Sequence, residues 1–448
     1  MFDRLVPPAL ARAALQHLLN DGVRRGHIVA WLGYNSWDML AMLVACERIG
    51  AVLLPLNGRL AAAELARIAT HAGAGHLMGT PDGDKLAAQV LALGRLRPGP
   101  ASGVEPGDLL LVYTSGTTGA PKGAMHTRSG LQAGVLAAVA AQGLTAQDRV
   151  LSVLPLFHVG GLCIQTLPAL AIGAKVLLHP RFEPDTWFDA VRDWRPSTTL
   201  LVPAVMRALL AHPRWPTADL SSLRFINSGS QIVPRALIEA FHHRGVPVAQ
   251  VYGATETGPV SIVLKPGEAM AHVGMAGRPA LGVSVQLASD GEILLKAPNL
   301  MRGYHRSREP AFDADGWFHT GDLAVQHADG MFEVVGRSKE LIISGGENIH
   351  PAEIEQLVAE LPEVAECAVV GVADERWGEV PALVVVPRDG QTFDRSALQA
   401  LLDTRLARFK HPHQVLELAA LPRTALGKVQ RQQLLDLLRP QGQAGGTG

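Results

Sequence analysis

The chain is poor in cysteine and aromatic residues and carries no excess of charge. Its three cysteines, Cys46, Cys163 and Cys367, are far apart and have no close cysteine or histidine partner, which argues against a disulfide framework and a zinc site. We expect small buried thiols in a reducing compartment. Lysine and arginine number 40 and the acidic residues 41, for a net charge of −1, so charge does not favour nucleic acid as a partner.

Long hydrophobic runs are also missing. The first residues contain Asp3, Arg4 and two prolines, which interrupt the apolar core that a signal peptide needs. The most apolar run, at residues 160–174, includes Gln165 and Pro168 and is too short and too broken to span a bilayer. We therefore expect a cytoplasmic protein without stable membrane insertion.

Histidine is frequent, with 17 copies, but its spacing does not indicate a metal centre. His242-His243 and His411-Pro412-His413 lack the i, i+4 spacing and the carboxylate of a zinc-protease motif. Surface histidines are the simpler interpretation.

At 448 residues the chain is too long for one ordinary core, so two or more domains are expected. Helical and strand-like patterns alternate along residues 9–56, and the strand-like stretches 174–179 and 197–203 each precede a helical run. Such alternation is typical of an α/β layer with a parallel sheet.

A loop of glycines and hydroxyl residues follows a short apolar run at residues 109–112 and reads YTSGTTGAPKG over residues 113–123. Glycines let backbone amides approach a ligand, successive N–H groups can form an anion-binding concavity, and Lys122 adds a point charge. The pattern predicts a phosphate-binding loop. It is not the common P-loop, because Pro121 stands at the second glycine position and Gly123 follows the lysine. An ordinary polar connector is the alternative, which the density of these residues disfavours.

A second polar turn, at residues 247–259, reads PVAQVYGATETGP. Near a polyphosphate, Glu256 could bind Mg²⁺, because hard oxygen ligands with few protein contacts suit that ion. The alternative is a surface turn whose carboxylate is merely solvated.

Residues 282–336 predict β-hairpins with Asp-Gly turns at 290–291 and 329–330. The pattern changes after Gly336. A short strand, a glycine loop and a helix that begins near Pro351 follow, and a further helix is expected at residues 396–406. We place a domain boundary at this change.

The run YTSGTTGAPKG resembles the phosphate-loop signature of the adenylate-forming enzymes, which include acyl-CoA synthetases, carrier-loading adenylation domains and luciferases. Further matches follow in the family's order at 252–257 (YGATET), 316–322 (GWFHTGD) and 422–428 (PRTALGK). The resemblance extends over most of the chain, although the chain begins late and its segment between Gly79 and Asp108 is short compared with the family.

The resemblance implies an α/β fold with a large N-terminal adenylation domain of layered α/β subdomains and a β-rich subdomain, followed by a small mobile α+β domain. In this chain these are residues 1–337 and 340–439. A hinge at 338–339 would contain Lys339, and residues 440–448, rich in glycine, are expected to be disordered.

The resemblance also assigns roles to single residues. Asp322 and Arg337 would bind the ribose, Tyr252 would stack on adenine, and Lys428, Glu256 and Thr255 would be catalytic, with Glu256 as the metal ligand. The residues implied to bind ATP or AMP are Thr114, Ser115, Gly116, Thr117, Thr118, Gly119, Lys122, Ser228, Gly229, Ser230, Gln231, Tyr252, Gly253, Ala254, Asp322 and Arg337.

The acid pocket is implied to contain His158, Gly161, Val205, Met206, Asn227 and Val251. With Gly253 and Ala254, these candidates include no fixed positive charge, so a second carboxylate on the substrate would be unpaired and costly to bury. An aryl or medium-chain acid is therefore favoured over a dicarboxylate. Coenzyme A would contact Ser344, Gly345, Gly346, Glu347, Trp377, Phe409 and Lys410.

The leading hypothesis is an acyl-CoA synthetase that uses ATP, Mg²⁺ and coenzyme A. An enzyme that loads a carrier-protein thiol in another chain is the first alternative, because no carrier domain follows Gly448. A non-catalytic nucleotide-binding module of the same fold is the second, and it is disfavoured because Lys428, Asp322 and Glu256 are all present. A luciferase-like oxygenase shares the same motifs. Oligomeric state stays open between a monomer and a homodimer.

Overall fold

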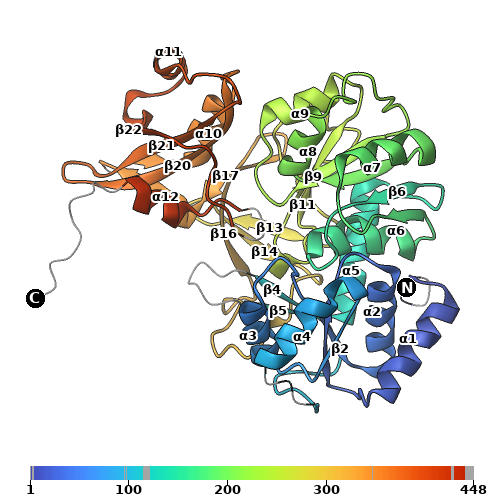
Figure 1. Ribbon diagram of the computed structural model, residues 1–448. Helices are drawn as coiled ribbons and strands as arrows, with labels where there is room; N and C mark the ends of the chain where they lie inside the picture. Colours follow the sequence, from blue (N-terminus) through green and yellow to red (C-terminus); the bar gives the residue numbers. More distant parts are fainter. Residues whose placement is uncertain are drawn as a thin grey trace, which may run out of the picture.

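The computed structural model of the chain describes residues 2, 5–94, 96, 98–114, 122–345, 347–424 and 428–438. Within these residues the strands form four sheets, two of which are large layers covered by helices (Figure 1). The predicted fold class, mixed α/β with a β-rich part and a small C-terminal α+β part, is confirmed.

The first sheet has six strands in the order β15-β5-β4-β2-β1-β3. Its strands are β1 (Ile28–Leu32), β2 (Val52–Pro55), β3 (His76–Gly79), β4 (Asp108–Thr114), β5 (Lys122–Thr127) and β15 (Gly303–Tyr304). Its helices are α1 (Pro8–Asn20), α2 (Trp37–Ile49), α3 (Ala62–Ala72) and α4 (Asp84–Leu93).

Alternate side chains of β1 are buried in two different hydrophobic cores, one on each face of the sheet. Val29 and Trp31 pack with α1 and α2, whereas Ile28 and Ala30 pack with α3 and α4. Successive side chains of a strand point to opposite faces, so a strand covered by helices on both sides is apolar throughout.

The second sheet has seven strands in the order β12-β11-β10-β9-β8-β6-β7. Its strands are β6 (Arg149–Ser152), β7 (Lys175–Leu178), β8 (Thr198–Leu201), β9 (Phe225–Gly229), β10 (Val248–Tyr252), β11 (Ile262–Val263) and β12 (Arg278–Pro279). The nearby helices are α5 (Arg128–Gln142), α6 (Leu167–Ala171), α7 (Pro184–Asp189), α8 (Pro203–Leu210) and α9 (Arg235–His242). Strands β6 to β10 pair in parallel, so their carboxyl ends share one edge.

The third sheet is antiparallel, in the order β13-β14-β16-β17. Its strands are β13 (Ser284–Leu287), β14 (Glu292–Lys296), β16 (Phe318–Gln326) and β17 (Phe332–Arg337). The expected Asp-Gly turns join these hairpins, with Gly291 and Gly330 at φ of 86° and 82°. Both predicted hairpins are confirmed.

The C-terminal unit contains β18 (Ile342–Ser344), β19 (Glu347–Ile349), β20 (Val364–Asp374), β21 (Gly378–Pro387) and β22 (Gln414–Glu417). Its helices are α10 (Pro351–Val358), α11 (Arg395–Arg405) and α12 (Arg431–Leu438). The helix expected to begin near Pro351 begins there, and α11 covers the helix expected at 396–406 within one residue at each end.

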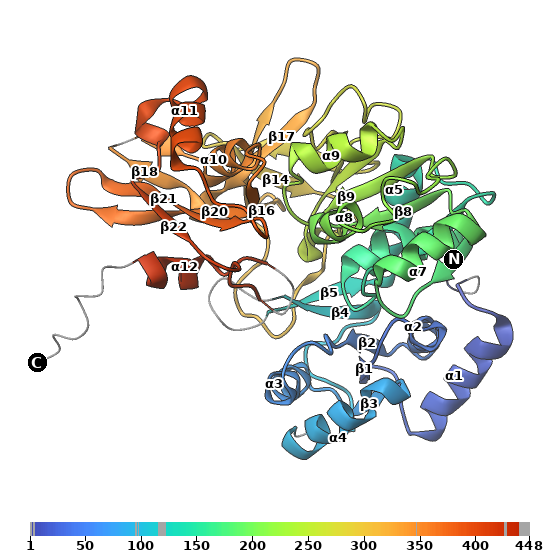
Figure 2. The same cartoon turned by 45° about the horizontal axis from the view of Figure 1, so that its top comes forward.

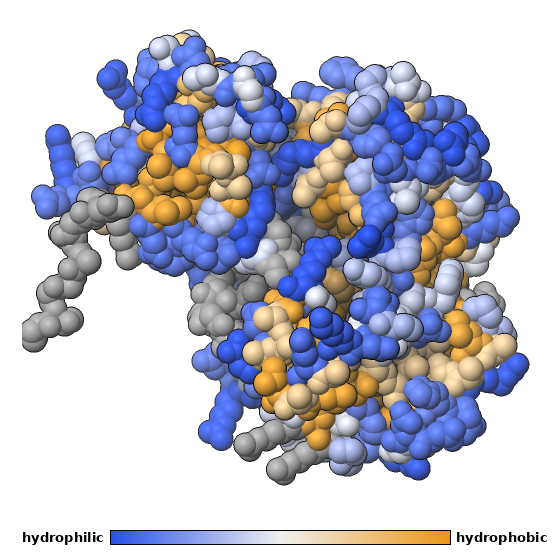
Figure 3. Space-filling model, viewed as in Figure 1, coloured by the Kyte–Doolittle hydropathy of each residue, from blue (hydrophilic) through white to orange (hydrophobic). Residues whose placement is uncertain are grey.

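The C-terminal unit stands beside the third sheet and helices α8 and α9, on the side away from α1 (Figure 2). Figure 3 shows the molecule hollowed where this unit meets the larger body. No helix among the described residues combines the length and apolarity needed to cross a bilayer.

Candidate active site

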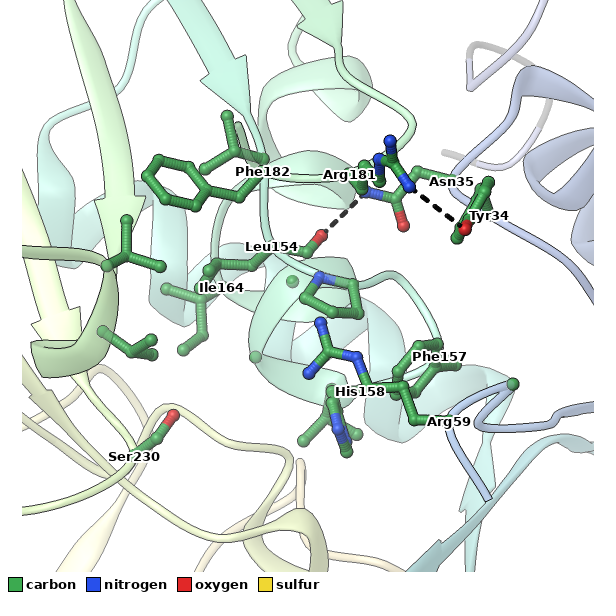
Figure 4. A pocket seen from close by; sticks show the side chains of 18 of the residues that line it. Tyr34, Asn35, Arg59, Leu154, Phe157, His158, Ile164, Arg181, Phe182 and Ser230 are labelled. Atoms are coloured by element: carbon green, nitrogen blue, oxygen red, sulfur yellow. Dashed lines mark hydrogen bonds between the residues drawn. The ribbon is translucent and has the colours of Figure 1, made fainter. Parts of the chain in front are cut away.

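A cavity of about 800 Å³ lies between the first two sheets. Its wall is built from loops at the carboxyl ends of strands and from one face of α8 (Figure 4). The apolar side chains of the wall include Leu32, Val153, Leu154, Phe157, Ile164, Phe182, Val202, Ala204, Val205, Ala208 and Val251.

The wall includes the acid-pocket candidates His158, Gly161, Val205 and Val251, but it does not include Met206 or Asn227. Met206 is fully buried and its Sδ accepts a hydrogen bond from the Ser228 hydroxyl at 3.5 Å. The buried Asn227 side chain donates to Oε1 of Gln142 at 2.6 Å. Both side chains therefore belong to the core behind the cavity.

His158 is a neutral donor or acceptor in this wall. Burial lowers its pKa to about 4, and the nearby charges of Arg59 and Lys428 act in the same direction. Figure 4 shows the imidazole beside Arg59 and Phe157, whose ring centroid lies 4.5 Å away. At neutral pH the ring is uncharged, so it can contact a bound acid without adding charge.

The cavity also contains two cations that sequence reasoning missed, Arg59 and Arg181, which corrects the expectation of a pocket without fixed positive charge. Arg181 is paired with Glu183: Nε of Arg181 lies 2.7 Å from Oε1 of Glu183. Nη1 of Arg181 also donates to the Tyr34 hydroxyl at 3.4 Å. The Arg59 guanidinium has no hydrogen bond or ion pair within the described residues. Both arginines follow a strand's carboxyl end, which is the signal that could have found them.

The predicted ribose residues form a connected chain. The Tyr252 hydroxyl donates to Oδ2 of Asp322 at 2.8 Å, and Nε of Arg337 lies 2.8 Å from Oδ1 of the same carboxylate. Asp322 and Arg337 are cross-strand partners on β16 and β17, so strand register holds them together. Burial, and secondarily the Asp322 charge, raises the pKa of Tyr252 well above its ordinary value, so this tyrosine is a neutral donor.

Next to these residues, at the carboxyl ends of β9 and β10, two glycines allow neighbouring segments of the backbone to pack closely against each other. A Cβ on Gly229 would lie 2.2 Å from the Val251 carbonyl oxygen, and one on Gly253 would lie 2.0 Å from that of Pro259. Ser230 has a φ of 70°, a conformation that costs a non-glycine residue energy and often marks a functional site. Ser230 lines the cavity, and Gln231 next to it is exposed.

The predicted phosphate loop is described at its two ends only. Ser115, Gly116, Thr117, Thr118 and Gly119 lie outside the described residues. At the first end, Oγ1 of Thr114 lies 3.5 Å from Oε1 of Glu256.

At the other end, the Lys122 ammonium lies 5.2 Å from the centroid of the Tyr304 ring. The Tyr304 hydroxyl donates to Oε1 of Glu256 at 3.1 Å. No motif singled out Tyr304.

The single carboxylate of Glu256 suits Mg²⁺ better than it suits a metal ion whose ligands all come from protein side chains. No group of three or more histidine, cysteine or acidic side chains that could hold a metal occurs among the described residues. Oε2 of Glu256 makes no hydrogen bond within that part of the chain. Mg²⁺ typically takes one or two carboxylates and completes its shell with water and phosphate oxygens.

Lys428 reaches this cavity from the C-terminal unit. Its backbone N–H donates to Oγ1 of Thr424 at 3.2 Å, and its carbonyl accepts from the Thr424 N–H at 2.8 Å. Burial and the charge of Arg337 lower its pKa, while the nearby carboxylates of Glu256 and Asp322 oppose this shift. The lysine thus lies within electrostatic reach of both the metal-ligand and the ribose candidates.

The described coenzyme A candidates lie outside this cavity, on the C-terminal unit. Gly345 donates its N–H to the Trp377 carbonyl at 2.8 Å, and Nζ of Lys410 lies 2.8 Å from Oε1 of Glu353. The side chains of Trp377 and Phe409 are each 42% exposed. Ser344 is buried, Glu347 is exposed, and Gly346 lies outside the described residues.

Comparison with known proteins places this site in a family. Residues 9–305 match the AMP-binding enzyme family and residues 353–428 its C-terminal domain. The chain is 45% identical to the indoleacetate–CoA ligase of Aromatoleum aromaticum, with 93% of this chain and 89% of the relative covered. It is 42% identical to a feruloyl-CoA synthase of Amycolatopsis, with 91% and 88% covered.

Among solved structures, o-succinylbenzoate CoA synthetase from Bacillus subtilis, in complex with its acyl-adenylate intermediate, superposes with a TM-score of 0.83. The two sequences are 30% identical, and the alignment covers 95% of this chain and 91% of that one. The family and enzyme class predicted from the sequence motifs are thereby confirmed. The chain belongs to the AMP-binding enzyme family and is an AMP-forming acid–thiol ligase, an acyl-CoA synthetase.

Proposed function

We propose that this ligase activates an aryl-substituted carboxylic acid as acyl-AMP and then transfers the acyl group to coenzyme A. The largely apolar cavity wall, with Phe157 and Phe182, supports an aryl group. So do the names of two relatives, whose acids are indoleacetate and ferulate. A medium-chain acid is the alternative that the same wall would accept.

In this proposal the nucleotide lies along the carboxyl ends of β9 and β10. Asp322 accepts from the ribose hydroxyls and Arg337 supports it, because the carboxylate has two acceptor oxygens and a fixed partner. In this proposal the adenine stacks on the ring of Tyr252, next to the tightly packed backbone at Gly229 and Gly253. Bound Mg²⁺ at Glu256 would neutralise charge on the phosphate oxygens.

In the first step a carboxylate oxygen of the acid attacks the α-phosphorus of ATP. A bond forms between that oxygen and phosphorus, and the bond to the pyrophosphate oxygen breaks. Because both reactants are anions, the transition state needs preorganised positive charge. Lys428 is proposed to supply it at the α-phosphate, with Thr255 donating beside it and Lys122 serving the departing pyrophosphate.

In the second step the coenzyme A thiolate attacks the carbonyl carbon of acyl-AMP, a thioester forms and AMP leaves. The proposed coenzyme A residues that the structure describes lie outside the cavity that Lys428 lines. We therefore propose a rotation of residues 340–439 against residues 1–337 about the hinge at 338–339, a motion that few backbone dihedrals can absorb.

One observation carries this proposal: Lys428, His158 and Val205 line the same cavity although they come from distant parts of the chain. The test is pyrophosphate release by the purified chain with ATP, Mg²⁺ and coenzyme A across aryl, medium-chain and dicarboxylic acids. Release with aryl acids and coenzyme-A-dependent thioester formation are expected. Release with dicarboxylic acids alone would contradict the assigned substrate class.

We further propose that the enzyme works in the cytoplasm, in keeping with its three free cysteines. Oligomeric state is a separate question, and a homodimer remains a prediction. Light scattering of the purified chain distinguishes a homodimer from a monomer of 47.6 kDa.

A further inference from the structure

Tyr304 contacts two residues that the proposed function assigns to the metal and the phosphates, Glu256 and Lys122. Its hydroxyl donates to Oε1 of Glu256 at 3.1 Å. The face of its ring lies under the Lys122 ammonium, 5.2 Å from ring centroid to Nζ. Lys122 begins β5 of the first sheet, whereas Glu256 lies in the short turn at residues 255–257 that follows β10 of the second sheet, so this one side chain bridges two separate segments.

The segment that carries Tyr304 is tightly attached on both sides. Met301 donates its N–H to the Glu256 carbonyl at 2.8 Å, and His305 donates its N–H to the Gly123 carbonyl at 2.7 Å. Arg302 binds Asp108 with two bonds of 2.9 Å, at the start of the strand that leads into the phosphate loop. The position of the Tyr304 ring is therefore fixed by backbone pairing as well as by its own contacts.

These contacts determine the protonation state of Tyr304 and the orientation of the Glu256 carboxylate. Burial, and secondarily the Glu256 charge, raises the pKa of Tyr304, so its hydroxyl stays protonated and can only donate to the carboxylate. With Oε1 engaged, the carboxylate is held in one orientation and Oε2 is left for a cation. The electron-rich ring face attracts the Lys122 ammonium and limits where that charge can lie.

We propose that Tyr304 is a positioning residue that orients Glu256 as the Mg²⁺ ligand through its hydroxyl and places Lys122 at the phosphates through its ring. The inference rests on the proposed use of Mg²⁺ and ATP at this site. The two functions of one side chain can be separated, because Tyr304→Phe removes the hydroxyl and keeps the ring, whereas Tyr304→Leu removes both.

The experiment measures ATP binding to the full chain by calorimetry while Mg²⁺ is titrated, alongside acid-dependent ATP–pyrophosphate exchange. For Tyr304→Phe the Mg²⁺ concentration at half-maximal ATP binding should rise roughly tenfold, the effect of losing a hydrogen bond to a charged group. Exchange at saturating Mg²⁺ should stay close to that of the wild type. Tyr304→Leu should in addition weaken ATP binding at saturating Mg²⁺, because Lys122 is no longer held.

Thr404→Val is the control, because it also removes one hydroxyl donor, but from the exposed side of α11, where that hydroxyl donates to the Ala400 carbonyl at 2.8 Å and lies outside the cavity. Its Mg²⁺ dependence should equal that of the wild type, and thermal melting of each variant shows whether it is folded. A Tyr304→Phe enzyme with unchanged or lower Mg²⁺ demand would overturn the proposal. Failure of the wild-type enzyme to exchange pyrophosphate at all would instead contradict the proposed function.

Discussion

At the level of single residues, the charged groups around Lys428 suit the role in acyl-AMP formation that is proposed for it. Lys428 is solvent-exposed where it lines the cavity; partial desolvation and the charge of Arg337 lower its pKa, while the carboxylates of Glu256 and Asp322 oppose that shift. A cation that neighbouring groups already hold in position can stabilise negative charge that develops on a substrate, because those groups do not need to reorganise during the reaction.

Replacing Lys428 should therefore separate the two half-reactions. In Lys428→Ala, acid-dependent ATP–pyrophosphate exchange should fall by at least roughly a hundredfold, as for the loss of a transition-state donor. Thioester formation from supplied acyl-AMP should persist. Lys175→Ala, on the exposed edge strand β7, is the control that should behave as the wild type. Equal loss of both half-reactions would contradict the role assigned to Lys428.

We expect two histidines, the buried His126 and the half-buried His158, to make the folded protein less stable in acid. Burial lowers the pKa of His126 and of His158 from 6.5 to about 4, and a hydrogen bond with the Thr255 backbone opposes the shift at His126. The unfolded chain therefore binds more protons than the folded chain between these values. Stability is lost as pH falls through this window, by up to about 1.4 kcal/mol per pH unit for each histidine.

Removing one of these titrations should flatten the pH dependence. His126→Asn keeps a donor for the Thr255 backbone but does not titrate. Its thermal midpoint should fall less than that of the wild type between about pH 7 and about pH 5. The exposed His17 provides the comparison: His17→Asn should follow the wild-type curve. An identical pH slope in all three proteins would show that His126 does not stay neutral.

At the level of elements, helix α8 joins three parts of the molecule. Ala204, Val205 and Ala208 line the cavity, Met206 is buried in the core, and Arg207 points toward the C-terminal unit. Successive residues of a helix are about 100° apart, so a short helix can present different residues to each of these neighbours. The size of the side chains on its cavity face then sets the space for the acid.

Enlarging one of these side chains should change which acids are accepted. Ala208→Leu should raise the KM for bulky aryl acids roughly tenfold or more, in line with the effect of a few methylene groups in a pocket. The KM for ATP and for a short-chain acid should stay nearly constant. Ala211→Leu, at the exposed end of the same helix, is the control. If the KM values of the Ala208→Leu enzyme for the different acids equal those of the wild type, the acid does not bind against this face of α8.

At the level of the whole molecule, an ion cluster connects the C-terminal unit to α8. Glu366 on β20 lies 2.8 Å from Nη2 of Arg423, near Lys428, and 3.9 Å from Nε of Arg207. Burial lowers the pKa of Arg207, and the Glu366 charge offsets part of that effect. If the C-terminal unit rotates as proposed, this cluster would favour the orientation in which Lys428 enters the cavity.

Weakening this cluster should favour other orientations. Glu366→Gln should slow acyl-AMP formation roughly three- to tenfold, the range for a partly exposed ion pair. Acyl transfer from supplied acyl-AMP should be equal to or faster than in the wild type. Glu417→Gln, which removes an exposed pair within the C-terminal unit, should change neither rate. A Glu366→Gln enzyme with a wild-type rate of adenylation would show that the cluster does not set the orientation.

Contiguous patterns were enough to predict the elements and the family. The apolar run before the phosphate loop became β4, the Asp-Gly turns joined antiparallel strands, and α10 began at Pro351. Each of these features depends on residues that are neighbours in the chain, so periodicity, turn chemistry and motif spacing suffice to predict them.

The composition of the cavity wall depended on packing between distant segments. Arg59 and Arg181 lie in two different loops, and no local periodicity shows that they line the same cavity. In the same way, no sequence pattern brings Tyr304 to Glu256, which its hydroxyl contacts. Met206 and Asn227, in contrast, sit beside residues of the site but turn into the core. Which side of a loop or helix faces the cavity is decided by the neighbouring sheets that cover its other side, and that information is not local in the chain.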